Sequence, residues 1–417
     1  MGSALATERA WPSVPLGELV ENLDSARVPV KAADRRPGPY PYYGASGVVD
    51  HVDDYLFDGE YLLVAEDGEN LRTRKTPVAF MARGKFWVNN HAHILRGNDR
   101  ADTRFLMYAL SRADVGAYLT GSTQPKLTQG ALRRIRIVAP PLSEQRRIAN
   151  TLGALDDKIE LNRRMNDTLE SIARTIFGSW FVDFDPAHKK IEGGEVGLPP
   201  DLAALWPAEF TQSEMGPIPR GWRAGSLGDI ADVVDCLHAK KPARRDAGHP
   251  LLQLFNIRDN GLLDLDEQYL IGHEDYAYWT SRFEARAGDC VITNVGRVGA
   301  VAQVPKGMHA ALGRNMTGIR CKPGFPYPTW LLQALLSSAM KEEVIRNTDT
   351  GTILQALNVR SIPRLRVILP PTELLTVYEV VSRPIRRQME DGLRESAALA
   401  DLRASLLPDL MSGRRFT

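Results

Sequence analysis

The chain has 417 residues, too many for one ordinary hydrophobic core, so its length predicts two or three domains. Apolar residues make up 43% of the sequence and charged residues 25%, a composition that favours neither a disordered protein nor a membrane protein. The formal net charge of +1 argues against a strongly basic nucleic-acid-binding protein, although it permits DNA binding.

Three features bear on where the protein works. No run of about 18 apolar residues is present, so no membrane span is expected. The first thirteen residues, MGSALATERAWPS, lack the basic start and apolar stretch of a secretion signal. The cysteines Cys236, Cys290 and Cys321 are widely spaced and form no CxxC pair. We therefore expect free thiols in a reducing cytoplasm, with neither disulfides nor a zinc site.

The first half opens with Trp11, four further residues and Leu16-Gly17-Glu18-Leu19. Runs such as 60–64 and 77–81, separated by Gly-rich turns, predict short strands, and a helix is expected over 103–118. The half closes on a phrase that runs from Gly121-Ser122 through Leu127, Leu132 and Ile135 to Pro140-Pro141. A small mixed α/β domain is therefore predicted between the two phrases.

A long helix is predicted after Pro140-Pro141, since proline favours the first helical turn and Ser143 can cap it. Apolar or small residues then recur at alternating steps of four and three, with Asn162 and Asn166 in the intermediate slots. The recurring positions are Ile148, Leu152, Leu155, Ile159, Leu169, Ala173 and Ile176. This heptad seam is typical of a helix packed lengthwise on a partner helix.

The second half repeats both phrases. Residues 187–221, rich in Gly and Pro, predict a linker with little regular structure, after which Trp222, four residues and Leu227-Gly228-Asp229-Ile230 repeat the opening. The closing phrase returns from Gly351-Thr352 to Pro370-Pro371 with the same spacings over about twenty positions. The residues between the phrases differ in length and sequence, which indicates a common frame around two different inserts.

The second insert is also expected to be mixed, with strands at 289–293 and 299–304 and a helix over 328–346. A second long helix follows, with a less regular stripe that we expect to end at Pro408. Its stripe consists of Ile385, Met389, Leu393, Ala397, Leu402 and Leu406. The predicted fold class is α/β (mixed α+β): two globular domains separated by two long antiparallel coiled-coil helices, with a pseudo-twofold internal repeat.

Polar and basic residues around the predicted turns are candidates for DNA contacts, because Arg reads guanine, Asn reads adenine and Lys grips phosphate. The first half offers Arg72, Arg74, Lys75, Arg83, Lys85, Asn89, Asn90, His91 and His93. The second half offers Lys240, Lys241, Arg244, Arg245, Asn294, Arg297, Arg314 and Asn315. For any one of them, a solvated charged surface is the alternative.

No catalytic or metal site is predicted. His91 and His93 would point the same way on a strand but lack a third ligand nearby in the sequence. The sequence has no GxxxxGK[ST] nucleotide loop and no GxSxG nucleophile motif. None of its Pro-Pro pairs has the preceding polar and following aromatic residue with which an amino-methyltransferase holds a flipped base.

Several of these motifs resemble a known family. Residues 140–145 (PPLSEQ) and 155–162 (LDDKIELN) are similar to the first central helix of type I restriction-modification specificity (S) subunits. The stretches 179–186 (SWFVDFDP), 216–222 (GPIPRGW) and 406–413 (LLPDLMSG) are typical of the same family. The second helix start departs from the pattern, because Pro371-Thr372-Glu373-Leu374 lacks the Glu-Gln of the first.

The resemblance implies a subunit without catalysis whose two target recognition domains each read half of a split double-stranded DNA target. It implies paired helices that act as a ruler and dock two methyltransferase subunits, to which two restriction subunits add. It places no cofactor in this chain and puts S-adenosylmethionine, ATP and magnesium on the partners. Helix residues for packing and docking would be Ile148, Leu152, Leu155, Ile159, Leu169, Ile385, Met389 and Leu393.

The expected organisation is a first recognition domain (1–140), a central helix (141–186), a linker (187–215), a second recognition domain (216–370) and a C-terminal helix (371–417). Two alternatives remain open. One is a protein–protein scaffold with a coiled coil and peptide-binding inserts, and the other is an enzyme with an unrecognised site.

Overall fold

The structure is a computed structural model that describes residues 11–121, 123–349 and 355–412. The chain divides into two compact units: unit 1 holds residues up to 160 together with those from 398 onward, and unit 2 holds residues 161–397. Ser122, Gly351, Thr352 and Gly413, named in the repeated phrases and the tail motif, lie outside the described residues. No helix among the described residues is long and apolar enough to cross a membrane.

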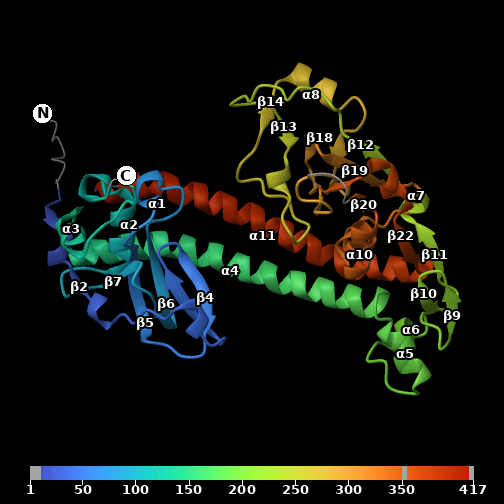
Figure 1. Ribbon diagram of the computed structural model, residues 1–417, viewed down its shortest axis with the longest axis horizontal. Helices are drawn as coiled ribbons and strands as arrows, with labels where there is room; N and C mark the ends of the chain where they lie inside the picture. The colour runs from blue at the N-terminus through green and yellow to red at the C-terminus, as the bar shows by residue number, and fades with distance from the viewer. Residues whose placement is uncertain (1–10, 122, 350–354, 413–417) are drawn as a thin grey trace, which may run out of the picture. The chain divides into compact units, whose positions relative to one another are not determined.

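Unit 1 is built on a six-stranded sheet with the order β2-β7-β5-β6-β3-β4, antiparallel except for the parallel pair β3 and β6 (Figure 1). The helix α2 (Thr103–Arg112) packs on β5, β6 and β7, and the Asp102 side chain caps its first turn. The strands are β2 (Val20–Asn22), β3 (Tyr40–Gly44), β4 (Gly47–Val52), β5 (Phe57–Ala65), β6 (Ala79–Val88) and β7 (Ala92–Gly97). The predicted runs at 60–64 and 77–81 thus fall largely in β5 and β6.

The two phrases that bound the first insert meet in unit 1. Strand β1 (Ser13–Pro15) pairs antiparallel with β8 (Arg136–Val138), and the backbone N–H of Leu16 donates to the carbonyl of Ile135 at 2.8 Å. The short helices η1 (Leu16–Glu18) and α3 (Gln129–Arg134) pack together here. Gly17 is required by this contact, because a Cβ atom there would lie 3.0 Å from the Cβ of Arg133.

Unit 2 contains the same arrangement. Strand β11 (Arg223–Ser226) pairs with β22 (Arg366–Leu369), and α7 (Leu227–Ile230) packs on η6 (Val359–Arg364). Leu227 donates to the carbonyl of Leu365 at 2.8 Å, and a Cβ on Gly228 would lie 3.0 Å from the carbonyl oxygen of Pro363. The two Leu-Gly phrases therefore repeat because each closes the base of its own insert. We call this arrangement the closing contact.

The insert of unit 2 differs from that of unit 1. It has two four-stranded sheets, with the orders β12-β19-β16-β17 and β14-β13-β18-β15, beside the helices α9 (Pro328–Leu336) and α10 (Ser338–Arg346). The strands are β12 (Ala231–Asp235), β13 (His249–Leu252), β14 (Leu270–Ile271), β15 (Ala285–Arg286), β16 (Cys290–Thr293), β17 (Val301–Gln303), β18 (His309–Leu312) and β19 (Met316–Cys321). The expectation of one helix over 328–346 is corrected to two helices, broken at Ser337, whose side chain caps α10.

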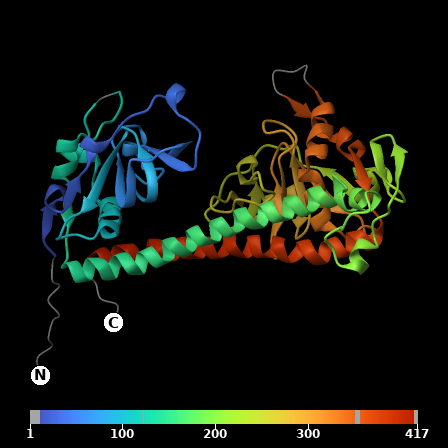
Figure 2. The same ribbon diagram turned by 90° about the horizontal axis from the view of Figure 1, so that it is seen from below.

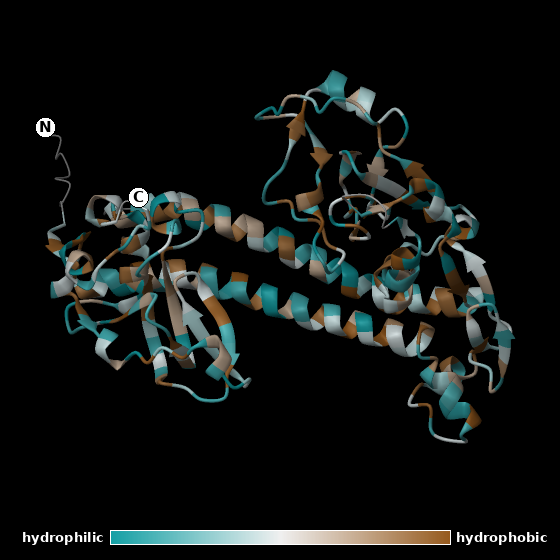
Figure 3. Ribbon diagram, viewed as in Figure 1, coloured by the Kyte–Doolittle hydropathy of each residue, from teal (hydrophilic) through white to brown (hydrophobic). Residues whose placement is uncertain are grey.

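The long helices α4 (Leu142–Phe181) and α11 (Thr372–Ser412) each have one part in each unit. Within unit 2 they run side by side in opposite directions (Figures 1 and 2), with Asn166 donating to the carbonyl of Met389 at 3.1 Å and the ring of Phe177 5.9 Å from that of Tyr378. Polar and apolar bands alternate along both helices (Figure 3). The predicted fold class, mixed α/β with two domains and a pair of long antiparallel helices, is confirmed.

The seam predicted on the first helix is buried or half-buried along its whole length. Ile148, Leu152 and Ala173 are buried, and Leu155, Ile159, Leu169 and Ile176 are half-buried. Asn162 and Asn166 are buried as well, and Asn162 donates to Glu395 at 2.8 Å. These amides satisfy backbone and side-chain acceptors of α11, which fits a role in fixing the register of the two helices.

The stripe predicted on the second helix is only partly right. Met389 is buried and Ile385, Leu393 and Leu406 are half-buried, but Ala397 is exposed and Leu402 is 45% exposed. Repeated steps of four overshoot a 3.6-residue turn by about 40° each, so the stripe rotates away from the partner helix.

Pro408 does not end the second helix, which continues to Ser412 and also contains Pro384. Leu410 and Met411 pack into the hydrophobic core of unit 1, and this burial offsets the hydrogen bond that Pro408 cannot donate.

The expected linker at 187–215 also has more structure than predicted. It includes most of α5 (Asp185–Ile191), all of α6 (Pro200–Ala203) and β9 (Phe210–Ser213), which pairs with β10 (Gly216–Pro219). The indole of Trp206 is 1% exposed and lies edge-on to Trp180 with the ring centres 5.0 Å apart. Burial of this aromatic side chain holds the segment on the core of unit 2.

Candidate nucleic-acid interface

The densest group of predicted DNA contacts in unit 2 is residues 240–245, here called the basic segment. Lys240, Lys241, Arg244 and Arg245 are all exposed there. The backbone of Arg245 bonds to the carbonyl of Leu270 at 2.9 Å, so the segment lies along β14. Four cations presented on an ordered backbone can bind phosphate without first ordering a loose tail.

Side chains fix the basic segment from both sides. The ammonium of Lys241 lies 3.9 Å from the ring centre of Tyr269, whose hydroxyl donates to the carbonyl of Pro242 at 2.7 Å. The guanidinium of Arg314 donates to the carbonyl of Ala239 at 2.9 Å. Arg314, predicted to contact DNA, therefore supports the segment through its Nε, and Arg244 is partly occupied by Glu267 at 3.3 Å.

Three further candidates lie in unit 2, and the prediction for one of them, Asn294, needs correction. Asn294 is 4% exposed and exchanges hydrogen bonds with the hydroxyl of Thr317, so it holds β16 and β19 together. Arg297 donates to the carbonyl of Ile257 and pairs with Asp259, which joins two loops. Asn315 adopts a left-handed turn with φ of 64° that an asparagine tolerates well. Asn294 therefore serves the fold, whereas Arg297, which is exposed, and Asn315 stay candidates for DNA contacts.

In unit 1 the segment 66–76 lies against residues 120–126. Gly68 donates its N–H to the carbonyl of Pro125 at 3.1 Å, and the guanidinium of Arg72 donates to the carbonyl of Gly121 at 2.8 Å. Arg74 donates to the carbonyls of Leu110, Ser111 and Ala113. The prediction that Arg74 reads a base therefore does not fit, because its donors satisfy the C-terminal carbonyls of α2. Lys75 is exposed.

The prediction that His93 contacts DNA also needs correction. Its side chain is 1% exposed, Nδ1 lies 2.6 Å from Asp24 and Nε2 lies 2.7 Å from the carbonyl of Leu127. Burial alone would raise the pKa of Asp24, but the hydrogen bond and charge of His93 hold that pKa below its ordinary value. His93 therefore joins three segments of unit 1 and is not accessible to DNA. His91, exposed, lies 2.8 Å from Asp67.

The remaining DNA-contact candidates of unit 1 form two groups, one at the turn after β6 and one on β6 itself. Asn89 is buried and accepts from the N–H of His91, which forms a turn and leaves Asn90 exposed. Arg83 pairs with Asp157 of α4 at 2.9 Å and therefore binds the insert to the helix. Lys85, on the same strand, is exposed and lies over the ring of Tyr55 at 4.5 Å. The exposed cations of unit 1 are thus more scattered along the chain than those of the basic segment in unit 2.

The predicted helix residues divide between packing and exposure. The seam residues Ile148, Leu152 and Met389 are buried, so they cannot themselves present a docking surface, which corrects that part of the prediction. Apolar side chains on the outer faces are available instead. These are Leu161 (57% exposed), Ile172 (42%) and Val380 (70%).

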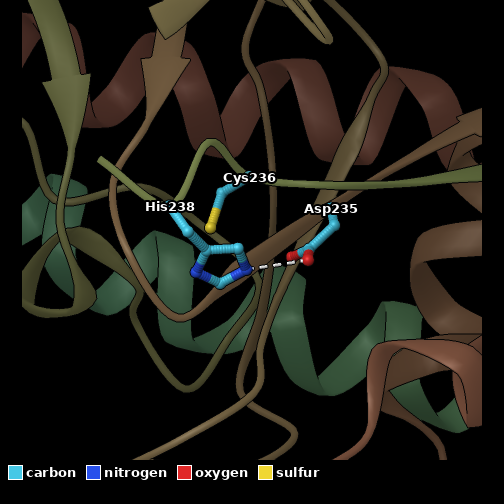
Figure 4. A group of neighbouring side chains, drawn as sticks. All are labelled: Asp235, Cys236 and His238. Atoms are coloured by element: carbon cyan, nitrogen blue, oxygen red, sulfur yellow. Dashed lines mark hydrogen bonds and ion pairs between the residues drawn. The ribbon is translucent and has the colours of Figure 1, made fainter.

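Sequence reasoning missed one group. Asp235, Cys236 and His238 bring a carboxylate oxygen, a sulfur and a ring nitrogen within 4.8 Å of one another, where β12 leads into the basic segment. Figure 4 shows the thiol and the carboxylate beside the imidazole of His238, whose Nε2 lies 2.8 Å from Asp235. The search for CxxC pairs could not find it, although the spacing Cys236-x-His238 was visible in the sequence.

The chain is similar to known proteins. A family model described as the type I restriction modification DNA specificity domain matches residues 8–171. A stretch of 145 residues is 40% identical to the Haemophilus influenzae protein S.HindORF215P, which is named as a type I restriction enzyme specificity subunit; it covers 34% of this chain and about a third (36%) of that relative. The HindI specificity subunit of the same organism is 22% identical over 85% of this chain and 84% of its own length.

One solved structure shares the fold. The type I restriction-modification S subunit from M. genitalium superposes with a TM-score of 0.63 over 98% of both chains, at 16% sequence identity. This likeness covers both units and the two long helices.

Proposed function

Because this chain belongs to the family of type I restriction-modification specificity subunits, we propose that it reads an asymmetric DNA target in two parts. Unit 1 would read one half-site and unit 2 the other, while the long helices hold methyltransferase subunits. The basic segment and the exposed cations Arg72, Lys75 and Lys85 would supply phosphate and base contacts.

The observation that carries this proposal is the repeated closing contact around two unlike inserts. Leu16 with Ile135 and Leu227 with Leu365 make the same backbone hydrogen bond at the same 2.8 Å. One closing contact bounds a single six-stranded sheet and the other bounds two four-stranded sheets. The same closing contact around two different inserts suits two DNA-recognition domains that share a scaffold and differ in the sequence that each one binds.

The chain itself would carry no catalysis. S-adenosylmethionine, ATP and magnesium would bind to partner subunits, two of them methyltransferases and two of them restriction subunits, in the cytoplasm. This chain would contribute the recognition of the DNA sequence, because its exposed cations and aromatic rings are suited to binding DNA. Polar side chains such as His93 and Asn294 are instead hydrogen-bonded within the fold.

The helices would set the distance between the half-sites. With 40 and 41 residues, each spans about 60 Å, whereas half-sites one helical turn apart are separated by about 34–36 Å. Inserting seven residues into both helices, after 160 and after 397, adds about 10 Å, which corresponds to about three base pairs. We expect a longer spacer with both half-sites unchanged. A seven-residue insertion into α4 alone is the control and should break helix packing.

Methylome sequencing of a host that expresses this chain with its methyltransferase partner tests the proposal. We expect one asymmetric split motif, and exchange of residues 11–139 for the insert of another S subunit should alter one half of it only. A change in both halves, or a contiguous motif, would overturn the assignment of one half-site to each unit.

A peptide-binding scaffold is the competing function. Binding of the purified chain with its methyltransferase partner to random duplex, measured against salt, separates the two. A DNA reader loses affinity steeply as salt rises, whereas a scaffold shows no comparable duplex binding.

A further inference from the structure

Asp235, Cys236 and His238 form a group that the reading of DNA does not use. Asp235 ends β12, opposite Thr317 of β19, and the N–H of Cys236 bonds to the carbonyl of Met316 at 3.2 Å. The backbone then turns, so that the His238 ring returns over the carboxylate (Figure 4). The strand pairing thus fixes two of the three side chains, while His238 stands at the surface.

The donor set is one that transition metals prefer. Thiolate, imidazole and carboxylate are the three side-chain ligands of zinc sites, and hard cations such as magnesium avoid sulfur. The ligand atoms all lie within 4.8 Å of one another, which a central ion at bond lengths of about 2.0–2.3 Å can bridge after small side-chain rotations. A fourth position toward solvent would take water, because His238 is exposed.

A second observation points the same way. The Oδ1 atom of Asp235 is buried, and among the described residues it has no hydrogen-bond partner. Within that part of the chain no lysine or arginine lies within ion-pair distance of this carboxylate. Arg282, which lies nearby, donates to the carbonyl of Cys236. A buried carboxylate oxygen without a hydrogen bond is unfavourable, and a bound cation would supply the partner that the described protein atoms do not.

We propose that Asp235, Cys236 and His238 bind one Zn²⁺ ion. On binding, the S–H bond of Cys236 breaks, the sulfur–zinc bond forms and the proton leaves to solvent. The imidazole of His238 would bind through Nε2, which now lies 2.8 Å from Asp235. The proton that Nε2 shares with this carboxylate moves through solvent to Nδ1, so the ring binds in its neutral form.

The position suggests a structural role. His238 lies two residues before the basic segment, so a zinc ion would fix the first turn of that segment to the end of β12. This consequence rests on the proposed function, whereas zinc binding itself does not.

The test uses the full chain purified with its methyltransferase partner, with Zn²⁺ and Co²⁺ as the probes. We expect one zinc per chain by elemental analysis and, with Co²⁺, a thiolate-to-cobalt charge-transfer band. Cys236→Ser should abolish the band, and His238→Asn should weaken metal binding more than about 100-fold, beyond what loss of an outer-sphere partner costs. Cys321→Ser and His249→Asn are matched controls of the same residue types and should bind metal normally.

His238→Asn keeps the test decisive if Cys236→Ser fails to fold, because His238 is exposed. Absence of zinc and of the cobalt band in the wild-type chain, or unchanged affinity in His238→Asn, would overturn the proposal and leave a buried thiol beside a His–Asp pair. Zinc binding without sequence-specific DNA binding would instead overturn the proposed function alone.

Discussion

Arg386 gives the sharpest test of how unit 2 is held on its helix. Its guanidinium, 8% exposed, donates to the carbonyls of Gly261 at 2.9 Å and Gln303 at 3.3 Å and pairs with Glu390 at 3.0 Å. Burial lowers its pKa, but an arginine stays charged in proteins. One buried cation therefore ties the loop at Gly261 and the end of β17 to α11.

Replacing this residue in Arg386→Leu leaves a buried carboxylate and two carbonyls without their donor. Breaking a buried pair in this way costs about 3–5 kcal/mol. For a unit of about this size, a change of 1 kcal/mol lowers the melting temperature by about 2–4 °C, so we expect a drop of about 6–20 °C. The double variant with Glu390→Leu should recover about 1–3 kcal/mol, because it removes the unpaired charge.

Differential scanning calorimetry of the full chain measures both changes. Arg387→Leu, exposed on the same helix, is the matched control and should move the transition by less than about 2 °C. If Arg386→Leu behaved like that control, or if the double variant were as unstable as the single one, the anchoring role would be refuted.

Three further predictions concern binding, the closing contact and acid stability. Lys240→Ala should reduce the slope of log affinity against log salt by about 0.9 if this side chain contacts phosphate, as measured on random duplex. Gly228→Ala should cost about 1–3 kcal/mol by thermal denaturation, because the added Cβ would lie 3.0 Å from the carbonyl oxygen of Pro363. The lowered pKa of Asp24, from an ordinary 3.8, means that its bond to His93 stabilises unit 1 above that pH and is lost as pH falls through the lowered pKa. Asp24→Asn should therefore make the free energy of unfolding less dependent on pH in that range.

Each has its own control. Lys306→Ala, an exposed lysine outside the basic segment, should leave the salt slope unchanged. Gly324→Ala, where a Cβ meets open space, should be neutral. Equal acid unfolding of Asp24→Asn and the parent chain would show that this carboxylate does not contribute.

The frame of the protein was predictable from the sequence because its signals are local and repeated. Leu16-Gly17 and Leu227-Gly228 recur since each makes the same short hydrogen bond, and the seam of α4 follows from a regular 3.5-residue period. The stripe of α11 failed where steps of four let it rotate, as Leu402 shows.

The candidate site was less predictable, because exposure and partners are set by distant parts of the chain. Arg74 caps a helix that ends near residue 112, and His93 of β7 meets Asp24 of the short 3-10 helix Asp24–Ala26. Nothing within a short window of sequence distinguishes these residues from Lys240 or Arg245, which are exposed. Asn294 likewise looked like a base reader, and its partner Thr317 lies 23 residues away.

Unit 1 combines residues from early and late in the chain, which affects the order in which the two units can fold during synthesis. Its core contains Leu410 and Met411 together with Ile148 and Leu152, whereas unit 2 is closed within residues 161–397. Synthesis from the N-terminus supplies every residue of unit 2 before it supplies the last turns of α11, which the core of unit 1 requires. A ribosome that stopped near residue 400 would release a finished unit 2 and a unit 1 with an open apolar face. The unit whose first residues are translated first is therefore the last to be completed.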